Sequence, residues 1–385
     1  MDLELLQIFL NIVLIFTALY LICIAAFTFG LFNLKERFHS INKNNLIKVS
    51  VLIAARNEEK NIEKLLESLK KQSFPKELFE VIIVNDHSTD NTDEIINDFI
   101  NKNKELDVKL LKAEKKGKKH AISQALHTAI NELVIVTDAD CVLNDLWIES
   151  IVGFYQEEKC KMILAPVLLS PAENLFEKMQ VLEHLSLIGS TAGSASIGFP
   201  VMCNGANMAY ERKAALEVEK FRKDFDIPSG DDMFLLEQFV KSYGHNNVKF
   251  LLSKSAVVKT KTCKTIKDFF RQRRRWVSKT KSYTSWKVIV TALIVLFFNL
   301  SIISLLVSAF FVPALWSIYI LLTLLKFFID FPLLKNITNF MNQGSLLKWV
   351  LPLEIIYPFY AVFTALSGTI FTKLKSENGK WSQSN

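Results

Sequence analysis

Carboxylate side chains directly follow two short apolar runs in the first half of the chain. Asp86 comes after residues 81–84, and the pair Asp138 and Asp140 comes at the end of an apolar run at 134–136. Two carboxylates separated by one residue can bind a single hard cation where the backbone turns, and Mg²⁺ or Mn²⁺ takes such ligands together with substrate phosphates. The same pair also fits two solvated acids in a turn. Its place at the end of an apolar run favours a metal site.

The apolar runs that carry these acids have the character of buried strands. They alternate with helical patterns in the order 49–55, 58–71, 81–84, 91–99, 108–111, 120–130 and 134–136. This alternation predicts an α/β fold, Rossmann-like with a mostly parallel sheet, in which ligands bind beyond the carboxyl ends of the strands. Neither a Gly-x-Gly-x-x-Gly after the first strand nor a Gly-x-x-x-x-Gly-Lys-Ser/Thr occurs, which argues against dinucleotide and P-loop proteins.

Long apolar blocks flank this α/β region. Residues 5–34 and 288–325 contain no charged side chain. As a helix the first block is about 45 Å long, enough to cross the ~30 Å core of a bilayer. A signal peptide is the alternative, but Asp2 and Glu4 precede the block and no small-residue cleavage site follows it. We predict a transmembrane anchor here and a transmembrane hairpin at 288–331 that turns near Val312-Pro313.

Basic residues indicate which side of the membrane the α/β region occupies. Lys35, Arg37, Lys43 and Lys48 follow the first block, and a basic cluster precedes the second. The positive-inside rule therefore predicts a cytoplasmic α/β region of an integral membrane protein, in a bacterial inner membrane.

The topology of the last apolar block, 349–371, stays open. Glu354 and two prolines interrupt it, which favours a re-entrant or interfacial segment over a span. Lys373, Lys375 and Lys380 predict a cytoplasmic tail, whereas three complete C-terminal spans would place the tail outside.

The net charge of +7 is concentrated in the segment 264–287, where apolar side chains are interleaved with lysines and arginines. A nucleic-acid patch, a juxtamembrane basic belt and an interfacial amphipathic helix all fit this composition. Because a membrane span follows directly, lipid headgroups are the nearest partners, and we expect no nucleic-acid binding. The five cysteines lack paired spacing, which argues against a zinc or disulfide framework.

Several motifs carry a resemblance to a known family. They occur in family order: Val51–Glu59, Val81–Asp90, Gly117-Lys118, Thr137–Asp140, Asn204–Asn207, Gly230–Asp232 and Gln272–Trp276. Together they resemble glycosyltransferase family 2, the inverting GT-A class. The Gln-x-x-Arg-Trp motif is similar to that of the membrane synthase branch, which includes cellulose, chitin, hyaluronan and poly-N-acetylglucosamine synthases.

The resemblance implies the site residues of a nucleotide-sugar enzyme, with a UDP-sugar as the expected donor. The implied nucleotide-sugar site contains Ala55, Arg56, Asn57, Glu58, Asp86, Lys118, Asp138, Asp140 and Gly205. Asp86 would contact the base, and Asp138 with Asp140 would bind Mg²⁺ or Mn²⁺, Asp140 being the better candidate ligand. Lys118 and the metal would balance the charge of the leaving diphosphate. The implied acceptor and diphosphate residues are Gln272, Arg275 and Trp276.

Gly230-Asp231-Asp232 resembles the position of the catalytic base. An acceptor hydroxyl is a poor nucleophile, so a carboxylate within hydrogen-bond reach must take its proton; we favour Asp232, with Asp231 as its neighbour. Ser229 or Asp231 could alternatively cap a helix over 233–243. Both interpretations are compatible, because a cap would hold the loop that presents Asp232.

These predictions define a sequence of domains. They are an anchor at 1–34, a basic linker at 35–48, a GT-A catalytic domain at 49–262, an interfacial helix at 263–287, a hairpin at 288–331, a loop at 332–348, a transmembrane or re-entrant segment at 349–371 and a tail at 372–385.

The predicted activity is transfer of a sugar to a hydroxyl of a membrane-associated lipid or glycan acceptor. Two alternatives remain: a processive polysaccharide synthase that extrudes its product, and a non-catalytic membrane assembly subunit. The intact carboxylate set argues against the second, because a lapsed enzyme has no physical need for it.

Overall fold

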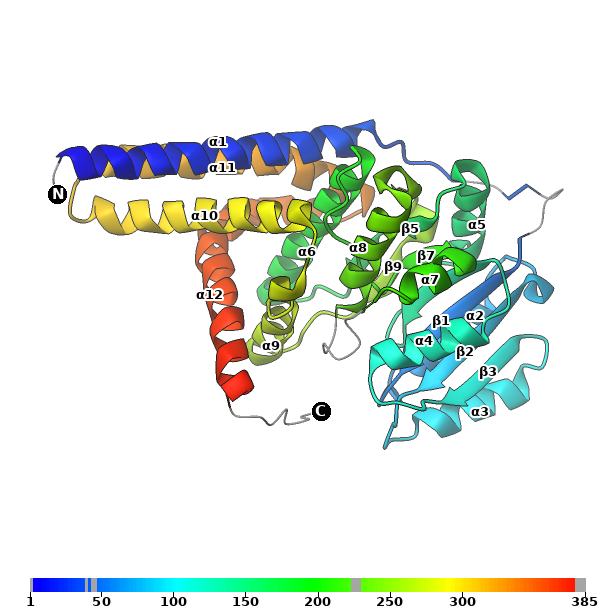
Figure 1. The fold of residues 1–385 in the computed structure, drawn as a ribbon. Coiled ribbons are helices and arrows are strands. Elements are labelled where there is room, and N and C mark those ends of the chain that lie inside the picture. The colour runs from blue at the N-terminus through cyan, green and yellow to red at the C-terminus, as the bar shows by residue number, and fades with distance from the viewer. Residues whose placement is uncertain (1–2, 39–40, 43–46, 223–229, 378–385) are drawn as a thin grey trace. The chain divides into compact units, whose positions relative to one another are not determined.

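The computed structural model describes residues 3–38, 41–42, 47–222 and 230–377, and Figure 1 shows their arrangement. The predictions that involve Asp2, Lys43, Ser229 and Lys380 lie outside the described residues. The chain divides into two compact units. We call them the sheet unit (Gly30–Ala172 and Ser190–Thr262) and the helical unit (Met1–Phe29, Glu173–Gly189 and Cys263–Asn385).

The sheet unit is built around seven strands in the order β3-β2-β1-β4-β7-β5-β8. Their bounds are β1 Val49–Ala55, β2 Phe79–Asn85, β3 Asp107–Lys112, β4 Leu133–Asp138, β5 Met162–Leu164, β7 Met208–Glu211 and β8 Val248–Phe250. The first four strands are parallel to one another, and β7 runs antiparallel to β4 and β5. The predicted α/β fold with a mostly parallel sheet is confirmed, and each predicted strand lies within an observed one.

Helices pack beside this sheet and connect its strands. They are α2 Ile62–Lys70, α3 Thr92–Lys102, α4 Lys118–Thr128, α5 Trp147–Glu158, α7 Arg212–Glu219 and α8 Asp231–Tyr243. Helix α2 begins later than the predicted Glu58, because residues 58–61 form a turn in which the Asn61 N–H donates to Glu58 O (2.9 Å). Helix α4 begins directly after Gly117, whose φ of 120° is readily available only to glycine.

Two further strands and several short helical turns complete the elements. Strand β6 (Val167–Leu169) pairs in parallel with β9 (Val258–Thr260). The 3₁₀ turns are η1 Lys76–Leu78, η2 His245–Asn247, η3 Lys254–Ala256, η4 Thr280–Ser282 and η5 Gly344–Trp349.

The register of the parallel strands brings their carboxyl ends to one edge. Ala55 at the end of β1 is opposite Asn85 at the end of β2, and Ala54 is opposite Asp138 at the end of β4. The residues that follow these ends therefore share one rim of the sheet, where open parallel sheets bind ligands.

A buried carboxylate ties the opposite, amino-end part of the sheet together. Glu80 on β2 is 2% exposed and accepts hydrogen bonds from Ser50 Oγ (2.6 Å) and Lys109 Nζ (2.6 Å). The Ile130 N–H adds a third bond at 3.1 Å. Burial alone would raise the pKa of Glu80, but these hydrogen bonds outweigh burial and hold the pKa below its usual value.

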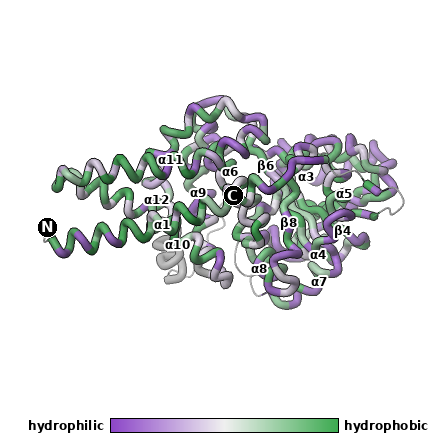
Figure 2. Tube along the Cα trace, turned by 90° about the horizontal axis from the view of Figure 1, so that it is seen from above, coloured by the Kyte–Doolittle hydropathy of each residue, from purple (hydrophilic) through white to green (hydrophobic). Residues whose placement is uncertain are grey.

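The helical unit contains long apolar helices. Helices α1 (Leu3–Asn33), α10 (Trp286–Ala309) and α11 (Leu315–Phe340) lie side by side in Figure 1, and α1 and α11 are largely green in the hydropathy view of Figure 2. Val13, Leu305 and Leu322 pack together between them, and the ring of Tyr20 stacks on Phe298 with centroids 4.0 Å apart. The predicted turn of the hairpin falls between α10 and α11, at residues 310–314.

The predicted loop at 332–348 is wrong for most of its length. Helix α11 continues through Pro332 to Phe340, and η5 then leads into α12 (Val350–Glu377), which also includes the start of the predicted tail. Asp330 and Pro332 do not end α11, because Lys326 Nζ donates to Asp330 Oδ2 (2.7 Å) and also pairs with Glu354 of α12. Neighbouring helices that satisfy polar groups in this way permit proline and charge inside an apolar helix.

The remaining helices of this unit are α9 (Ile266–Val277) and the first part of α6 (Leu175–Ser196). The predicted catalytic domain at 49–262 is thus interrupted, since residues 173–189 belong to the helical unit. Helix α12 packs along α9, where Phe270 meets Phe363 with ring centroids 5.3 Å apart. In Figure 1 α12 runs across the direction shared by α1, α10 and α11.

Four helical segments of the described chain are long and apolar enough to cross a membrane. They are Leu3–Asn33, Trp286–Ala309, Leu315–Phe340 and Gly344–Gly368. Their exposed faces carry large apolar side chains such as Ile22 of α1 (68% exposed) and Phe328 of α11 (67%), which suits contact with lipid. The chain therefore has the membrane-associated character that its apolar blocks predict.

Candidate active site

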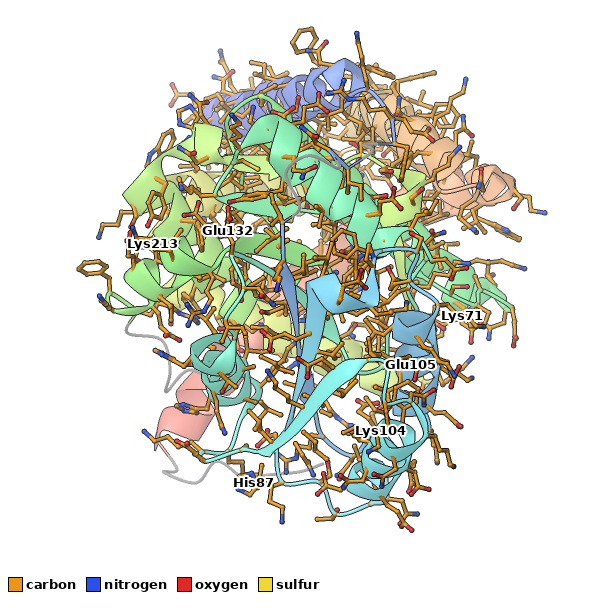
Figure 3. All side chains as sticks on the ribbon, turned by 90° about the vertical axis from the view of Figure 1, so that its right-hand side faces the viewer. Lys71, His87, Lys104, Glu105, Glu132 and Lys213 are labelled. Carbon is orange, nitrogen blue, oxygen red and sulfur yellow. The ribbon has the colours of Figure 1, made fainter. Side chains whose placement is uncertain are left out.

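The carboxyl edge of the sheet presents Asp86 in a buried position. Its Oδ1 accepts a hydrogen bond from the Gly117 N–H (2.9 Å) and lies 3.2 Å from His87 Nδ1. Arg56 approaches Oδ2 to 3.9 Å. Figure 3 shows His87 far from Lys104 and Glu105, which precede the amino end of β3. The carboxylate of Asp86 is thus held at the rim by a main-chain donor and two cationic or polar side chains.

The turn after β1 is fixed by hydrogen bonds to the loop after β2. The Asn57 N–H donates to Ser88 Oγ (3.0 Å), and the Thr89 N–H donates to Asn57 Oδ1 (2.8 Å). The Glu58 N–H donates to Thr92 Oγ1 (2.8 Å). This reciprocal pairing allows Asn57 to keep a left-handed conformation (φ 54°). Ala55, Arg56, Asn57 and Glu58 therefore form one ordered rim segment with Asp86.

The predicted metal ligands lie at the end of β4. Asp138 forms an ion pair with Lys118, the first residue of α4. Asp140 Oδ2 accepts a hydrogen bond from Thr260 Oγ1 (3.0 Å) at the end of β9. Burial raises the pKa of Asp140, and the negative charge of Asp138 raises it further.

Negative charge is in excess around these two carboxylates. Burial also raises the pKa of Glu58; a hydrogen bond from Asn61 opposes that rise, and the charges of Asp140 and Asp138 reinforce it. Among the described residues no group of three or more His, Cys, Asp and Glu side chains is placed to hold one metal ion. Two carboxylates are nevertheless what Mg²⁺ or Mn²⁺ commonly takes from a protein when phosphates and water supply the other ligands. The donor set and its mutual repulsion fit a divalent cation.

Two neighbouring acids at the start of α8 have different partners. Asp231 pairs with Arg222 at 2.5 Å, and both side chains are almost buried. Asp232 Oδ2 instead accepts a hydrogen bond from the Gly205 N–H (3.1 Å). A Cβ atom at residue 205 would lie 3.4 Å from that of Asp232, so the glycine allows the main chain to approach the carboxylate closely.

The electrostatics of Lys118 connect the two acidic groups. Lys118 is only partly buried, with 47% of its side chain exposed. Desolvation alone would lower its pKa, but Asp138, Asp232 and Asp231 raise the pKa above its usual value. The carboxylates after β4 and at the start of α8 thus act on the same ammonium group. The structure thus brings Asp138 to Lys118 and Gly205 to Asp232, residues predicted from distant motifs. Helices α4 and α8 meet where Lys119 Nζ lies 4.7 Å from the centroid of the Phe234 ring.

Gln272, Arg275 and Trp276 belong to the helical unit, on α9. Thr265 caps this helix by accepting a hydrogen bond from the Asp268 N–H (3.1 Å). Arg275 is exposed, whereas Gln272 and Trp276 are half-buried. Gln272, Arg275 and Trp276 thus all lie on one helix of the helical unit, whereas the other predicted site residues belong to the sheet unit.

Sequence reasoning missed three residues that contact the predicted site residues. Thr260 donates a hydrogen bond to Asp140, and Arg222 forms an ion pair with Asp231. Arg273 contacts both Gln272 and Trp276. The spacing of residues in the sequence does not reveal them. Thr260 and Arg222 reach their partners only in the folded chain, and Arg273 is one of three consecutive arginines.

The parallel sheet with carboxylates at its carboxyl edge defines a GT-A domain. Residues 50–218 match the family model described as Glycosyl transferase family 2. Residues 50–218 therefore match a glycosyl transferase family 2 domain, as the motifs within that range predict.

Two curated relatives have similar sequences over part of their length. The probable glycosyltransferase YdaM of Bacillus subtilis is 28% identical over 240 residues, which cover 61% of this chain and 56% of YdaM. The poly-beta-1,6-N-acetyl-D-glucosamine synthase of Staphylococcus epidermidis is 29% identical over 196 residues, which cover 48% of this chain and 46% of the synthase. The matched region is about half the length of each relative.

A solved structure shares the fold over nearly the whole chain. It is the mannosyltransferase PcManGT from Pyrobaculum calidifontis in complex with GDP-Man and Mn²⁺. Its TM-score is 0.59 at 16% identity, and the match covers 91% of this chain and 98% of that chain.

Proposed function

We propose that this chain is an inverting, metal-dependent glycosyltransferase. It moves a hexose-type sugar from a nucleotide diphosphate sugar, with UDP-sugars as the first candidates, to a hydroxyl of a membrane-associated lipid or glycan. The observation that carries this proposal is the set of carboxylates at the carboxyl edge of the sheet: Asp138 is paired with Lys118, and Asp86 accepts a hydrogen bond from the Gly117 N–H (2.9 Å). One rim thus combines cationic and acidic groups for both halves of a transfer reaction.

The donor occupies the carboxyl edge of the sheet. The rim segment Ala55–Glu58 and Asp86 hold the nucleoside, and Lys118 holds the diphosphate. Asp138 and Asp140 hold Mg²⁺ or Mn²⁺, which neutralises charge on the leaving diphosphate when bound. The family match and the Mn²⁺ and GDP-Man named with PcManGT support a nucleotide-sugar donor with a divalent cation.

Asp232 takes the proton of the acceptor hydroxyl. Its Oδ2 is oriented by the Gly205 N–H, while Asp231 is engaged by Arg222. A carboxylate held in place can remove the proton as the oxygen attacks the anomeric carbon, and holding both substrates together supplies a large part of the rate gain. Gln272, Arg275 and Trp276 bind the acceptor sugar and the diphosphate.

The sheet unit works on the cytoplasmic side of a membrane that α1, α10 and α11 cross. The basic residues Lys35 and Arg37 after α1 support this orientation, as do those of 264–287 before α10. We further propose that α12 lies along the inner leaflet, because it runs across those three helices in Figure 1.

A processive polysaccharide synthase is the second candidate. The similarity to the poly-beta-1,6-N-acetyl-D-glucosamine synthase favours it. We prefer one or few additions, because the described chain offers four candidate spans at most and known processive synthases generally carry more. The length of the labelled product separates the two.

The test uses the full chain in lipid nanodiscs. UDP-GlcNAc, UDP-glucose and GDP-mannose are each added with Mn²⁺, Mg²⁺ or EDTA, and the unfolding temperature is followed. We expect one donor to raise it only when the cation is present, since a ligand that binds the folded state stabilises it.

The same donor, radiolabelled, is then incubated with a membrane lipid extract. Wild-type protein should label a lipid or glycan product, and the variants Asp140→Ala and Asp232→Ala should not. Transfer that survives both substitutions would exclude this mechanism.

A further inference from the structure

The side chain of Arg273 is buried in the middle of the basic helix α9. It is 3% exposed, whereas Arg271 and Arg275 on the same helix are exposed. Burying a guanidinium is costly unless its donors and its charge are satisfied. Arg273 therefore requires partners for both its charge and its hydrogen-bond donors.

Two other helices of the same unit supply these partners. Glu183 of α6 forms an ion pair with the guanidinium, and both side chains are below 10% exposed. Arg273 Nε donates to Tyr360 Oη of α12 (2.9 Å), and that hydroxyl donates in turn to Glu183 Oε1 (3.3 Å). Arg273, Glu183 and Tyr360 thus form a closed triangle of hydrogen bonds that joins α9, α6 and α12.

The guanidinium of Arg273 also contacts two residues of the Gln-x-x-Arg-Trp motif, Gln272 and Trp276. Nη1 donates to Gln272 Oε1 (2.8 Å), and Cζ lies 4.1 Å from the centroid of the Trp276 ring. A second ring, that of Phe269, lies 4.7 Å away. The planar group is therefore hydrogen-bonded at its edge and stacked on its face, which a lysine ammonium cannot reproduce.

We propose that Arg273 is a positioning residue that holds Gln272 and Trp276 in one orientation through its triangle with Glu183 and Tyr360. It does not itself touch a substrate. Its anchoring on α6 and α12 fixes the two motif side chains that meet the acceptor. This inference rests on the proposed function for the role of those two residues, but not for the contacts that orient them.

The first experiment observes Trp276 without any substrate. The chain contains six tryptophans, so full-length protein labelled with 5-fluorotryptophan gives a small set of ¹⁹F resonances, and Trp276→Phe identifies the one from residue 276. In Tyr360→Phe and Arg273→Lys we expect this resonance to shift or broaden. The other resonances should stay in place, because Tyr360→Phe keeps the ring that packs on Phe269 (5.4 Å between centroids).

Arg271→Met is the matched control. Arg271 lies on the same helix and pairs only at the surface with Asp268 (3.1 Å), with 57% of its side chain exposed. This variant removes one positive charge and should leave the Trp276 resonance unchanged. An unchanged resonance in both Tyr360→Phe and Arg273→Lys would overturn the proposal, as would an equal change in Arg271→Met.

The second experiment measures kinetics with the donor, UDP-GlcNAc or GDP-mannose, and varying amounts of membrane lipid extract. Tyr360→Phe should raise the KM for the acceptor by about three- to tenfold, the scale of one lost hydrogen bond to a charged group. The KM for the donor should change less than about twofold. Equal changes in both would contradict a positioning role. If the wild type transfers no sugar from any donor, the proposed function fails, while the ¹⁹F result still decides whether Arg273 orients Trp276.

Discussion

At the scale of single residues, the start of α8 separates two adjacent carboxylates by their surroundings. Asp231 is held by a nearly buried arginine, whereas Asp232 is oriented by the main chain of residue 205. An ion pair that is almost dehydrated resists a change of partner, and a carboxylate oriented by one N–H keeps lone pairs for a hydroxyl. Substitution of Asp232 should therefore affect catalysis, and substitution of Asp231 should affect stability.

Asp232→Asn should lower kcat by about 10²- to 10⁴-fold, because an amide cannot accept the acceptor's proton. Donor binding should change little, since the nucleotide lies at other residues. Steady-state transfer assays together with the donor-dependent rise in unfolding temperature measure the two effects.

Asp231→Asn is the matched control for that experiment. It removes the carboxylate opposite Arg222 and should lower the free energy of unfolding by about 2–4 kcal/mol. If a variant of Asp232 kept full activity, or if only Asp231→Asn lowered kcat, the assignment of Asp232 as the base would be wrong.

The candidate site shows how far residue patterns reach. Asp86, Asp138, Asp140 and Asp232 could be predicted because each follows a strand or opens a helix in a family motif. Thr260 and Arg222 could not, since their contacts join segments more distant than any spacing rule connects. The ion pair between Asp138 and Lys118 could not be predicted either, because only the fold brings the two side chains together.

At the scale of elements, Glu80 joins β1, β2 and β3 through donors from all three strands or their connections. Its hydrogen bonds lower the pKa below that of the unfolded chain. A depressed pKa means that the stabilisation is fully present above the unfolded value, about 4.3, and is lost as the pH falls through the folded value.

Glu80→Gln should lower the free energy of unfolding by about 2–3 kcal/mol at pH 7, because the ion pair with Lys109 and a charge-assisted bond are lost. Below pH 4 the difference from wild type should shrink, as the wild-type carboxyl also becomes neutral. Denaturant unfolding of the full chain at several pH values tests this. A difference that does not vary with pH would mean that packing, not charge, is the cause.

The contact between α9 and α12 depends on a glycine. A Cβ atom at Gly368 would lie 2.7 Å from Val277 Cγ1 and 2.9 Å from its Cβ. Gly368→Ala should therefore destabilise the protein by about 1–3 kcal/mol through overpacking.

Combining it with Val277→Ala removes the closer of the two contacts, that with Cγ1, and should restore part of the loss, which a double-mutant cycle of thermal unfolding quantifies. Leu366→Ala, at a position 54% exposed, serves as the control on the same helix. Additive effects of the two substitutions would show that the residues do not couple.

Elements were predictable where one local signal dominated. The apolar runs at 49–55 and 134–136 gave strands with nearly correct bounds, because a buried parallel strand is apolar on both faces. The end of α11 was not predictable, since Asp330 and Pro332 normally terminate an apolar helix. Here Lys326 and Glu354 satisfy the charge, and the helix continues.

At the scale of the whole molecule, the direction of α12 decides on which side of the membrane the chain finishes. In the topology proposed above, three spans return the chain to the side of the sheet unit, and a helix along the leaflet would keep Lys373 and Lys375 there. A fourth span would carry both across, against the positive-inside rule.

We therefore expect a protease-sensitive tag appended after Asn385 to be protected in intact spheroplasts. A tag inserted at Phe311, 82% exposed in the turn between α10 and α11, should be cleaved. Disrupted cells should expose both tags to the protease. Cleavage of the C-terminal tag in intact spheroplasts would establish a fourth crossing and contradict the in-plane assignment.

The pairing of Lys326 with Glu354 has a consequence for biogenesis. Lys326 and Asp330 lie on α11, and the set of charges around Lys326 is completed only by Glu354 of α12. In a chain that stops before residue 354, Lys326 would lack Glu354 as a partner, and α11 would be less stable in the membrane. Helix α12 therefore completes the charge pairing of a helix that precedes it in the chain, and a truncated product would lack that pairing.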